Sequence, residues 1–335
     1  MIIPIFLPHV GCLDRCSYCN QDVITDVGEE TLRKRIEQSL GACRGLCEVG
    51  LFGGNMFGIE PEALYRLFSY FNEYRDKITN FRISTKPVPL NDDIVAILKS
   101  NNVTVIELGI PTFNNHILKN LNRKHTGEDL GKAFHRLTQE GFHVALQVMV
   151  GLPYETRDDI KETVSNVIRL NPSYIRIYPL AFIEGTPLAE QYISGEFTPI
   201  TFEEALYRAM FIYLKVSQRG IKIVKMGLTD NEVIKDRIIA GYHHPAFGHL
   251  VKSEAFFRAI MAKLEGVKRG EAVTVFLNAR DISHLLGHER KNLGRFEQAG
   301  LAVSWQADDI PAGAFALRLR DGYSAGSVFD ALSGS

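Results

Sequence analysis

The stretch GCLDRCSYCNQ, residues 11–21, holds three of the five cysteines in this chain of 335 residues. The spacing of Cys12, Cys16 and Cys19 places three thiolates on one short loop, and soft sulfur ligands select zinc, copper or iron–sulfur centres. Three thiolates leave one coordination position open. A structural zinc requires a fourth ligand, and His9 is near enough in the sequence to supply it, so zinc and an iron–sulfur centre are both open interpretations.

The composition indicates a protein without a dominant surface charge. Lys and Arg number 38 against 39 Asp and Glu, so any contact with nucleic acid or a membrane depends on a local patch. The odd number of cysteines and their tight spacing favour metal or redox chemistry in a reducing compartment over a secreted disulfide framework. We identify no secretory leader and no apolar run of the ~20 residues that a membrane span needs, so we expect a soluble cytoplasmic protein.

Short apolar runs alternate with helical patterns from residue 1 to about residue 225. Such alternation predicts an α/β fold with a parallel sheet and right-handed crossovers, either closed as a barrel or open. The runs that we predict as buried strands are residues 2–6, 47–54, 81–86, 103–110, 143–152, 174–180 and 221–228.

Residues suited to binding or chemistry lie at the ends of these predicted strands. They are Gly53, Gly54, Lys86, Glu107, Gly151 and Tyr178. Because the carboxyl ends of parallel strands meet at one edge of a sheet, we expect these residues to converge on one rim.

The alternation ends after about residue 225. A loop rich in His, Gly and Pro follows, in which His243, His244 and His249 either bind a metal or pack with neighbouring aromatic residues. Further on, the order strand, helix, turn, helix, strand, strand predicts a small α+β domain. The predicted segments are residues 1–225 for the barrel, 226–265 for an extension and 266–335 for the small C-terminal α+β domain.

The loop of Cys12, Cys16 and Cys19, with Tyr18 just before the last cysteine, resembles the cluster loop of radical S-adenosylmethionine (radical SAM) enzymes. In that family the three cysteines hold three irons of a four-iron four-sulfur (4Fe-4S) cluster, and the amino and carboxylate groups of S-adenosylmethionine chelate the fourth iron. The resemblance therefore implies an α/β fold, a partial (β/α)6 TIM-like barrel, that binds both cofactors.

Longer stretches make the resemblance more specific. Residues 82–130, with QVMVGLPYET at 147–156 and YIRIYPLAFIEGTPLAEQY at 174–192, are similar to the radical domain of the catalytic subunit of the Elongator complex and its short bacterial relatives. The similarity extends over roughly residues 2–260. The Elongator subunit also carries an acetyltransferase domain, but the remaining residues of this chain are too few and too different to form one, so acetyl transfer is not implied.

The resemblance assigns cofactor contacts by position. Gly53, Gly54 and Asn55 in LFGGN match the glycine motif whose backbone meets the methionine amino group, a close approach that only Gly permits. Lys86 matches the basic residue that pairs with the carboxylate of S-adenosylmethionine. The part that cradles adenine corresponds to Gln147, Met149 and Gly151.

Other positions have structural alternatives. Glu107 lies on a predicted buried strand, so its carboxylate needs a donor, either the ribose hydroxyls or a neighbouring arginine. Tyr178 is a candidate for substrate contact or radical relay, or it packs at the rim. Arg123 and His125 in NRKHT match the family's NRGHT; Lys124 replaces the glycine and leaves the conformation of that loop open, and capping a helix is the alternative role of His125.

The C-terminal segment resembles the nucleic-acid-binding KH fold, in which a GxxG loop clamps the backbone. Gly287 matches the first glycine and Arg290 replaces the second. This turn is part of a local basic face, which predicts contact with RNA; a scaffolding or dimerising domain is the alternative. The candidate RNA-binding residues are Arg290, Lys291 and Arg295.

Three functions follow as hypotheses. The first is a radical SAM enzyme that cleaves S-adenosylmethionine reductively, forms a 5′-deoxyadenosyl radical and modifies RNA, in particular tRNA, with an electron donor such as flavodoxin or ferredoxin. The second is a radical SAM enzyme that acts on a small metabolite, lipid or tetrapyrrole. The third is a zinc-stabilised binding protein without turnover.

Overall fold

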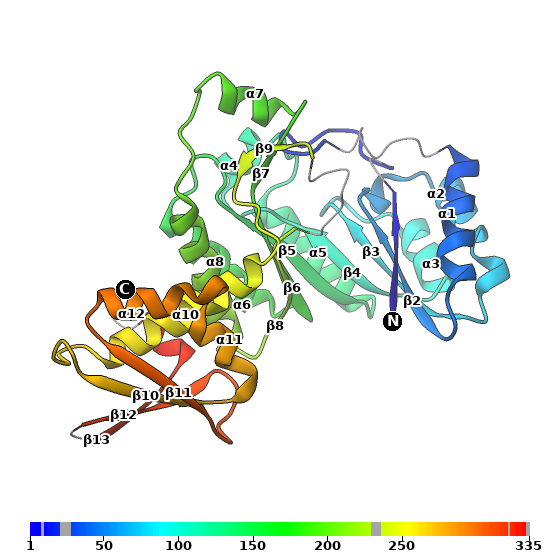
Figure 1. Cartoon of the computed structure of the whole chain (residues 1–335). Helices are drawn as coiled ribbons and strands as arrows, with labels where there is room; N and C mark the ends of the chain where they lie inside the picture. Colours follow the sequence, from blue (N-terminus) through cyan, green and yellow to red (C-terminus); the bar gives the residue numbers. More distant parts are fainter. Residues whose placement is uncertain (8–9, 21–27, 229–235, 321, 333–335) are drawn as a thin grey trace. The chain divides into compact units, whose positions relative to one another are not determined.

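The computed structural model describes residues 1–7, 10–20, 28–228, 236–320 and 322–332 (Figure 1). The chain divides into two compact units. The first comprises Met1–Pro199, Ile221–Val224 and Thr229–Tyr242, and the second comprises Ile200–Gly220, Lys225–Leu228 and His243–Ser335. Among the helices described, none is both long enough and apolar enough to cross a membrane.

A seven-stranded sheet carries most of the predicted site residues (Figure 1). Its strands are β1 (Ile2–Phe6), β2 (Cys47–Phe52), β3 (Ile78–Thr85), β4 (Val103–Gly109), β5 (His143–Val150), β6 (Tyr174–Pro179) and β8 (Lys222–Met226). They lie side by side in that order, and the neighbours from β1 to β6 pair in parallel. Because β1 and β8 are the two end strands, the sheet is an open half-barrel, which confirms the predicted α/β partial barrel.

The helices of the first unit follow the strands, as the alternation predicted. They are α1 (Glu29–Gly41), α2 (Pro61–Ser69), α3 (Asp92–Ser100), α4 (Asn115–Asn120), α5 (Gly127–Gln139), α6 (Arg157–Leu170) and α7 (Pro187–Ile193), with short 3-10 turns at Met56–Gly58 and Asn72–Tyr74. Capping boxes start two of them, at Thr126 and Asp129 for α5 and at Thr156 and Asp159 for α6. A two-stranded sheet of β7 (Ala181–Ile183) and β9 (Ile238–Gly241) completes this unit.

The two faces of the half-barrel sheet differ in polarity. In β4, Ile106 and Leu108 are fully buried, on the opposite face of the strand from Glu107. The face of Glu107 also bears Val105, which packs with Ala145 of β5 and Tyr174 of β6 in a small apolar cluster. Polar side chains occupy the positions adjoining this cluster, so the inner face combines an apolar patch with a buried ionic network.

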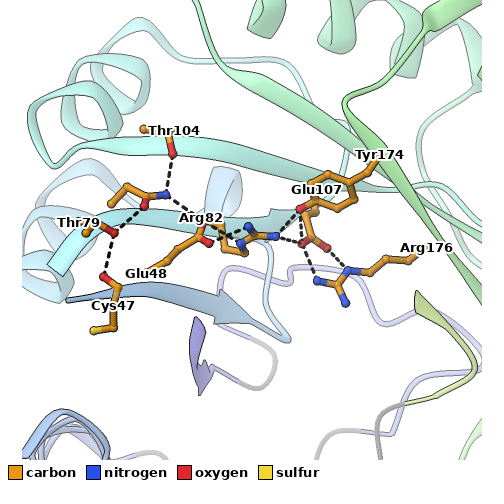
Figure 2. A network of polar contacts seen from close by, with 9 residues as sticks. Cys47, Glu48, Thr79, Arg82, Thr104, Glu107, Tyr174 and Arg176 are labelled. Carbon is orange, nitrogen blue, oxygen red and sulfur yellow. Dashed lines mark hydrogen bonds and ion pairs between the residues drawn. The ribbon is translucent and has the colours of Figure 1, made fainter. Parts of the chain in front are cut away.

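Glu107 is the centre of that network (Figure 2). Its side chain is fully buried, and the guanidinium of Arg176 binds both oxygens, with Nε to Oε2 at 2.8 Å and NH2 to Oε1 at 2.9 Å. Tyr174 donates its hydroxyl to Oε1 at 2.7 Å, and Gln147 donates its amide to Oε2 at 2.8 Å. Protein groups therefore engage both carboxylate oxygens, and of the two partners expected for Glu107 the structure shows the arginine.

Arg82 extends the network to the next strand. It binds Glu48 through Nε and NH2 at 2.9 and 2.8 Å, and its NH1 lies 3.4 Å from Glu107. Burial opposes ionisation of Glu107, but the hydrogen bonds and charge of Arg176 outweigh it and hold the pKa of this carboxyl below its usual range. Two acids and two arginines thus balance one another across β2, β3, β4 and β6.

Replacing Glu107 by Gln leaves the half-buried Arg176 without its carboxylate partner and leaves Arg82 with Glu48 alone. We expect the free energy of unfolding to fall by about 3 kcal/mol, because an uncompensated buried charge is costly. Urea unfolding of the metal-free, reduced protein, followed by circular dichroism at pH 7, measures the loss.

Glu128→Gln is the matched control. Its carboxylate pairs with Lys132 on the surface and is 77% exposed, so the change should stay within about 0.5 kcal/mol. Because the pKa of Glu107 is lower in the folded than in the unfolded protein, its contribution to the free energy of unfolding is fully present above the unfolded pKa of about 4.3. This contribution is lost as the pH falls through the folded pKa. The difference in unfolding free energy between wild type and Glu107→Gln should therefore disappear on acidification. Equal losses in the two variants, or a gap that persists in acid, contradict this account.

The second unit contains a four-stranded sheet and its helices. The strands are β10 (Ala272–Leu277), β11 (Ala302–Ala307), β12 (Ala314–Leu319) and β13 (Gly322–Ser327), in the order β11-β10-β12-β13. The helices are α8 (Phe202–Ser217), α10 (Phe247–Lys263), α11 (Ile282–Leu286) and α12 (Lys291–Gln298), with 3-10 turns at Ala279–Asp281, His288–Arg290 and Val328–Leu332. β13 was not predicted, because its sequence GYSAGS lacks apolar alternation.

Candidate functional site

The three clustered cysteines lie on residues 10–20, the thiol loop, which follows β1. Cys16 is buried, whereas Cys12 and Cys19 are half-buried, and all are free thiols. The backbone N–H of Cys19 donates to the carbonyl of Cys16 at 3.0 Å, which closes a tight turn between the second and third cysteine. His9, the predicted fourth ligand of a zinc, lies outside the described residues.

Residues at strand ends and on neighbouring segments hold the thiol loop in place. Lys86, just after β3, donates its ammonium to the carbonyl of Asp14 at 2.6 Å. Asn122 donates to the carbonyl of Arg15 at 2.7 Å. Two further bonds come from the backbone, where the N–H of Ser17 donates to Leu121 at 3.1 Å and that of Leu188 donates to Ser17 at 2.9 Å.

Arg123 makes the contact that reaches a cysteine side chain. Its NH1 lies 3.2 Å from the Sγ of Cys16, and its NH2 donates to the carbonyl of Gly109 at the end of β4. Burial opposes ionisation of Cys16, but the charges of Arg123 and Lys86 outweigh it and hold the pKa of this thiol below its usual range. Arg123 therefore joins the thiol loop to the sheet and favours the thiolate that a metal requires.

The predicted glycine motif packs against the thiol loop. Gly53 has a φ of +96°, and a Cβ on Gly54 would lie 2.6 Å from the carbonyl oxygen of Val10. Asn55 donates to the carbonyl of Gly11 at 3.1 Å and accepts from the backbone N–H of Lys86 at 3.1 Å. Asn55 thus ties together the loop, the glycine turn and the end of β3.

The predicted residues of β5 and β6 share the inner face. Gln147 donates to Glu107 and also to the hydroxyl of Ser84, at 3.1 Å. Met149 and Tyr178 are half-buried and adjacent in the register of β5 and β6, and burial raises the pKa of the Tyr178 hydroxyl to about 12. The structure therefore brings Gln147 to Glu107, and Tyr178 next to Met149.

Gly151, just after β5, has a backbone that requires glycine. Its φ is +82°, and a Cβ there would lie 2.2 Å from the ring of Tyr242. Its backbone N–H donates to a carboxylate oxygen of Glu155 at 2.8 Å. The close approach of a protein ring thus explains this glycine.

The NRKHT segment differs from the sequence interpretation in two ways. Thr126, not His125, caps α5, so capping does not explain the buried His125. Burial and the charge of Arg123 lower the pKa of His125 to about 3, which keeps its ring neutral. Lys124 needs no glycine-like backbone, because the positive φ of this loop, 54°, falls on Asn122.

The basic residues predicted for RNA contact have different surroundings. Arg295 donates to Glu254 at 2.7 Å and lies 3.5 Å over the ring of Phe257, so its charge is engaged within the protein. Arg290 and Lys291 are exposed at the turn, and Arg290 adopts the left-handed conformation, φ 59°, that suits the glycine it replaces.

The predicted histidine loop packs ring against ring. The rings of His244 and His288 lie 5.0 Å apart, and those of His249 and His284 lie 5.2 Å apart. In the part of the chain that the structure describes, no three His, Cys, Asp or Glu side chains converge so as to hold a single metal ion. The rings of His244 and His249 therefore pack against other rings, as one of the two interpretations predicted.

Two protein-family models match consecutive parts of the chain. The Radical SAM superfamily matches residues 6–167, and the Radical_SAM C-terminal domain matches residues 172–256. The chain belongs to the radical SAM superfamily. The first match contains the thiol loop and strands β2 to β5, and the second begins just before β6 and ends within α10. The radical SAM family, predicted from the resemblance of the cysteine loop, is therefore confirmed.

Individual related proteins share between 25% and 32% of their residues with this chain over the aligned parts. An uncharacterized protein of Methanocaldococcus jannaschii is 28% identical over 207 residues, covering 61% of this chain and 62% of the relative. The tRNA uridine(34) acetyltransferase of the same organism is 32% identical over 154 residues, covering 45% and 28%. The heme chaperone HemW of Lactococcus lactis is 25% identical over 182 residues, covering 52% and 48%. The chain thus spans less than two thirds of each of these relatives.

Solved structures show the same fold. Elp3 of Methanocaldococcus infernus, lacking residues 1–46, superposes with a TM-score of 0.61 at 20% identity, covering 96% of this chain and 74% of that one. Coproporphyrinogen III oxidase (HemN) of Escherichia coli superposes with a TM-score of 0.53 at 17% identity, covering 65% and 52%. At these identities the similarity establishes the fold alone.

Replacing Arg123 by Met should loosen the thiol loop, because it removes two bonds and keeps the apolar volume. We expect amide hydrogen exchange across residues 12–19 of the metal-free protein to accelerate by about tenfold, which corresponds to the loss of a charge-assisted hydrogen bond. Exchange measured by mass spectrometry resolves this segment.

Arg136→Met is the control, since Arg136 lies on the surface of α5 and pairs with Asp92 and Glu140. It should leave the loop unchanged. Exchange in residues 12–19 that is equal in the two variants contradicts the role given to Arg123.

Proposed function

We propose that this chain is a radical SAM enzyme whose thiol loop holds a 4Fe-4S cluster through Cys12, Cys16 and Cys19. The observation that carries the proposal is the buried Cys16 thiol, fixed 3.2 Å from a guanidinium on a loop tied to the strand ends. Three thiols on one loop suit the three protein-bound irons of the family's 4Fe-4S cluster, whereas a structural zinc requires a fourth protein ligand.

S-adenosylmethionine is the second cofactor in this proposal, and the residues present fit it. Arg123 is buried and its Nε has no hydrogen-bond partner among the described groups, so a donor remains for an anionic group beside the thiols. Gly53 and Gly54 leave backbone without side chains next to the loop. When bound, the cluster and S-adenosylmethionine would together supply a 5′-deoxyadenosyl radical able to remove a hydrogen atom from a substrate.

The protein's own residues bind and orient these groups. Lys86 and Arg123 supply positive charge for the carboxylate, and Gly53, Gly54 and Asn55 shape the backbone that meets the amino group. The residues assigned to the adenosine side are Gln147, Met149 and Gly151. Glu107 acts through Gln147, whose amide it fixes at 2.8 Å, and Tyr178 stands next to Met149 as the candidate for substrate contact.

RNA, in particular tRNA, is the substrate class that we propose. Support comes from the tRNA uridine(34) acetyltransferase, whose similar region is 32% identical to this chain, and from the C-terminal domain with its exposed Arg290 and Lys291. An electron donor such as flavodoxin or ferredoxin, in the cytoplasm, would reduce the cluster. The similarity to HemW supports a second candidate, a protein that handles a tetrapyrrole or another small molecule.

The direct test is release of 5′-deoxyadenosine. The chain is purified without oxygen, reconstituted with iron and sulfide, reduced and incubated with S-adenosylmethionine. We expect about four irons per chain and release by the wild type. Cys16→Ala should lose release by at least 100-fold, because the cluster lacks one of its three protein ligands.

Cys43→Ala is the matched control, since Cys43 is also buried but lies outside the thiol loop. It should retain iron and release. Colourless protein that binds zinc, with no release by the wild type, would establish the binding-protein alternative instead.

The substrate class is tested separately in a strain that lacks the gene. If the substrate is RNA, we expect one modified nucleoside to disappear from digested tRNA and to return with the wild-type gene but not with Cys16→Ala. An unchanged nucleoside profile together with an altered tetrapyrrole or small-metabolite profile would contradict RNA and support the second candidate.

A further inference from the structure

The C-terminal sheet has one buried and one open face. In β10, Val273, Val275 and Leu277 are fully buried, whereas Thr274 and Phe276 point to the opposite side. Figure 1 shows α10, α11 and α12 together on one side of this sheet. The face that carries Thr274 and Phe276, here named the open face, is turned away from the buried core of the unit.

Two rows of side chains cross the open face. The register aligns Ser304, Thr274, Arg318 and Tyr323 in one row over all four strands. The next row begins with Gln306 and Phe276 and continues with two alanines on β12 and β13. Tyr323 is 74% exposed, and Phe276 is half-buried beside these small alanines.

The charge on this face has one sign. Arg318 is the single charged residue in the described strands β10 to β13, and none of them contains an acid. Its guanidinium lies 5.3 Å over the ring of Phe276 and donates to the hydroxyl of Thr274 at 3.3 Å. The guanidinium therefore lies over an aromatic ring and has no carboxylate partner on these strands.

A sheet face that combines an arginine with two aromatic rings has the chemistry that single-stranded nucleic acid requires. Bases stack on aromatic rings and on guanidinium planes, while phosphates pair with arginine, and small polar side chains do not obstruct the strand. A second copy of the chain fits less well, because pairing this face with itself would bring two arginines together without an acid to separate them.

We propose that the open face of the C-terminal sheet binds single-stranded RNA, with bases stacked on Phe276 and Tyr323 and with Arg318 contacting the phosphate backbone or a base. The choice of RNA over DNA rests on the RNA substrate proposed above. In this arrangement the sheet, rather than the turn with Arg290 and Lys291, makes the main contact with the substrate.

The test measures binding of a fluorescent 12-nucleotide single-stranded RNA to the intact chain by anisotropy. Tyr323→Ala and Phe276→Leu should each raise Kd by about tenfold, because each removes a stacking surface. Arg318→Gln should reduce the salt dependence of binding by about one phosphate contact. Tyr65→Ala, which removes another exposed tyrosine from α2, should leave Kd unchanged.

Other results would overturn the proposal. One is RNA binding that survives the open-face variants but is lost in Arg290→Glu with Lys291→Glu, which would place the contact at the turn. Equal affinity for DNA of the same sequence would remove the assignment to RNA. A wild-type dimer that Tyr323→Ala converts to a monomer, with no RNA bound, would make the face a self-association surface.

The two proposals fail separately. Release of 5′-deoxyadenosine without RNA binding would reject the open-face proposal and leave the radical enzyme intact. RNA binding that depends on Tyr323 and Phe276, without release, would reject the enzyme and retain the binding surface.

Discussion

The contact between the Arg123 guanidinium and the Cys16 thiol is the interaction on which the site depends. Residues 10–20 form no helix or strand, so their position is set by groups that reach in from elsewhere. Arg123 comes from a segment 107 residues away and holds Cys16 and the end of β4 at once. Because one buried cation bonds to both, the thiol and the strand end keep a fixed spacing.

The ionic network on the inner face of the half-barrel sheet is the second constraint. Glu107 draws Arg176 and Arg82 together, and the latter carries the connection on to Glu48, so four strands are linked by charge on their inner face. Breaking such a network by removing one partner is expensive, since the remaining charges stay buried. The candidate cofactor residues lie toward the carboxyl ends of strands of this same sheet. The ionic network therefore fixes the spacing of the strand ends that carry them.

Much of this architecture could be predicted from the sequence. The alternation of apolar runs and helical patterns predicted an α/β fold with a parallel sheet, because periodicity is a local pattern. The resemblance of the loop of Cys12, Cys16 and Cys19 to the radical SAM cluster loop added the partial barrel and the family. The partners of Glu107 stayed open, since burial demands a donor but does not say which one. The contact of Arg123 with Cys16 was missed because it joins distant segments. β13 was missed because small polar residues carry no periodic signal.

The claim that the thiol loop holds a cluster with a position for S-adenosylmethionine is tested most directly by electron paramagnetic resonance. The reconstituted and reduced protein is recorded before and after addition of S-adenosylmethionine. We predict the signal of a reduced 4Fe-4S cluster, a change in its shape on addition, and no such signal from Cys16→Ala. A spectrum without an iron–sulfur signal, or one that S-adenosylmethionine leaves unchanged, would contradict the account.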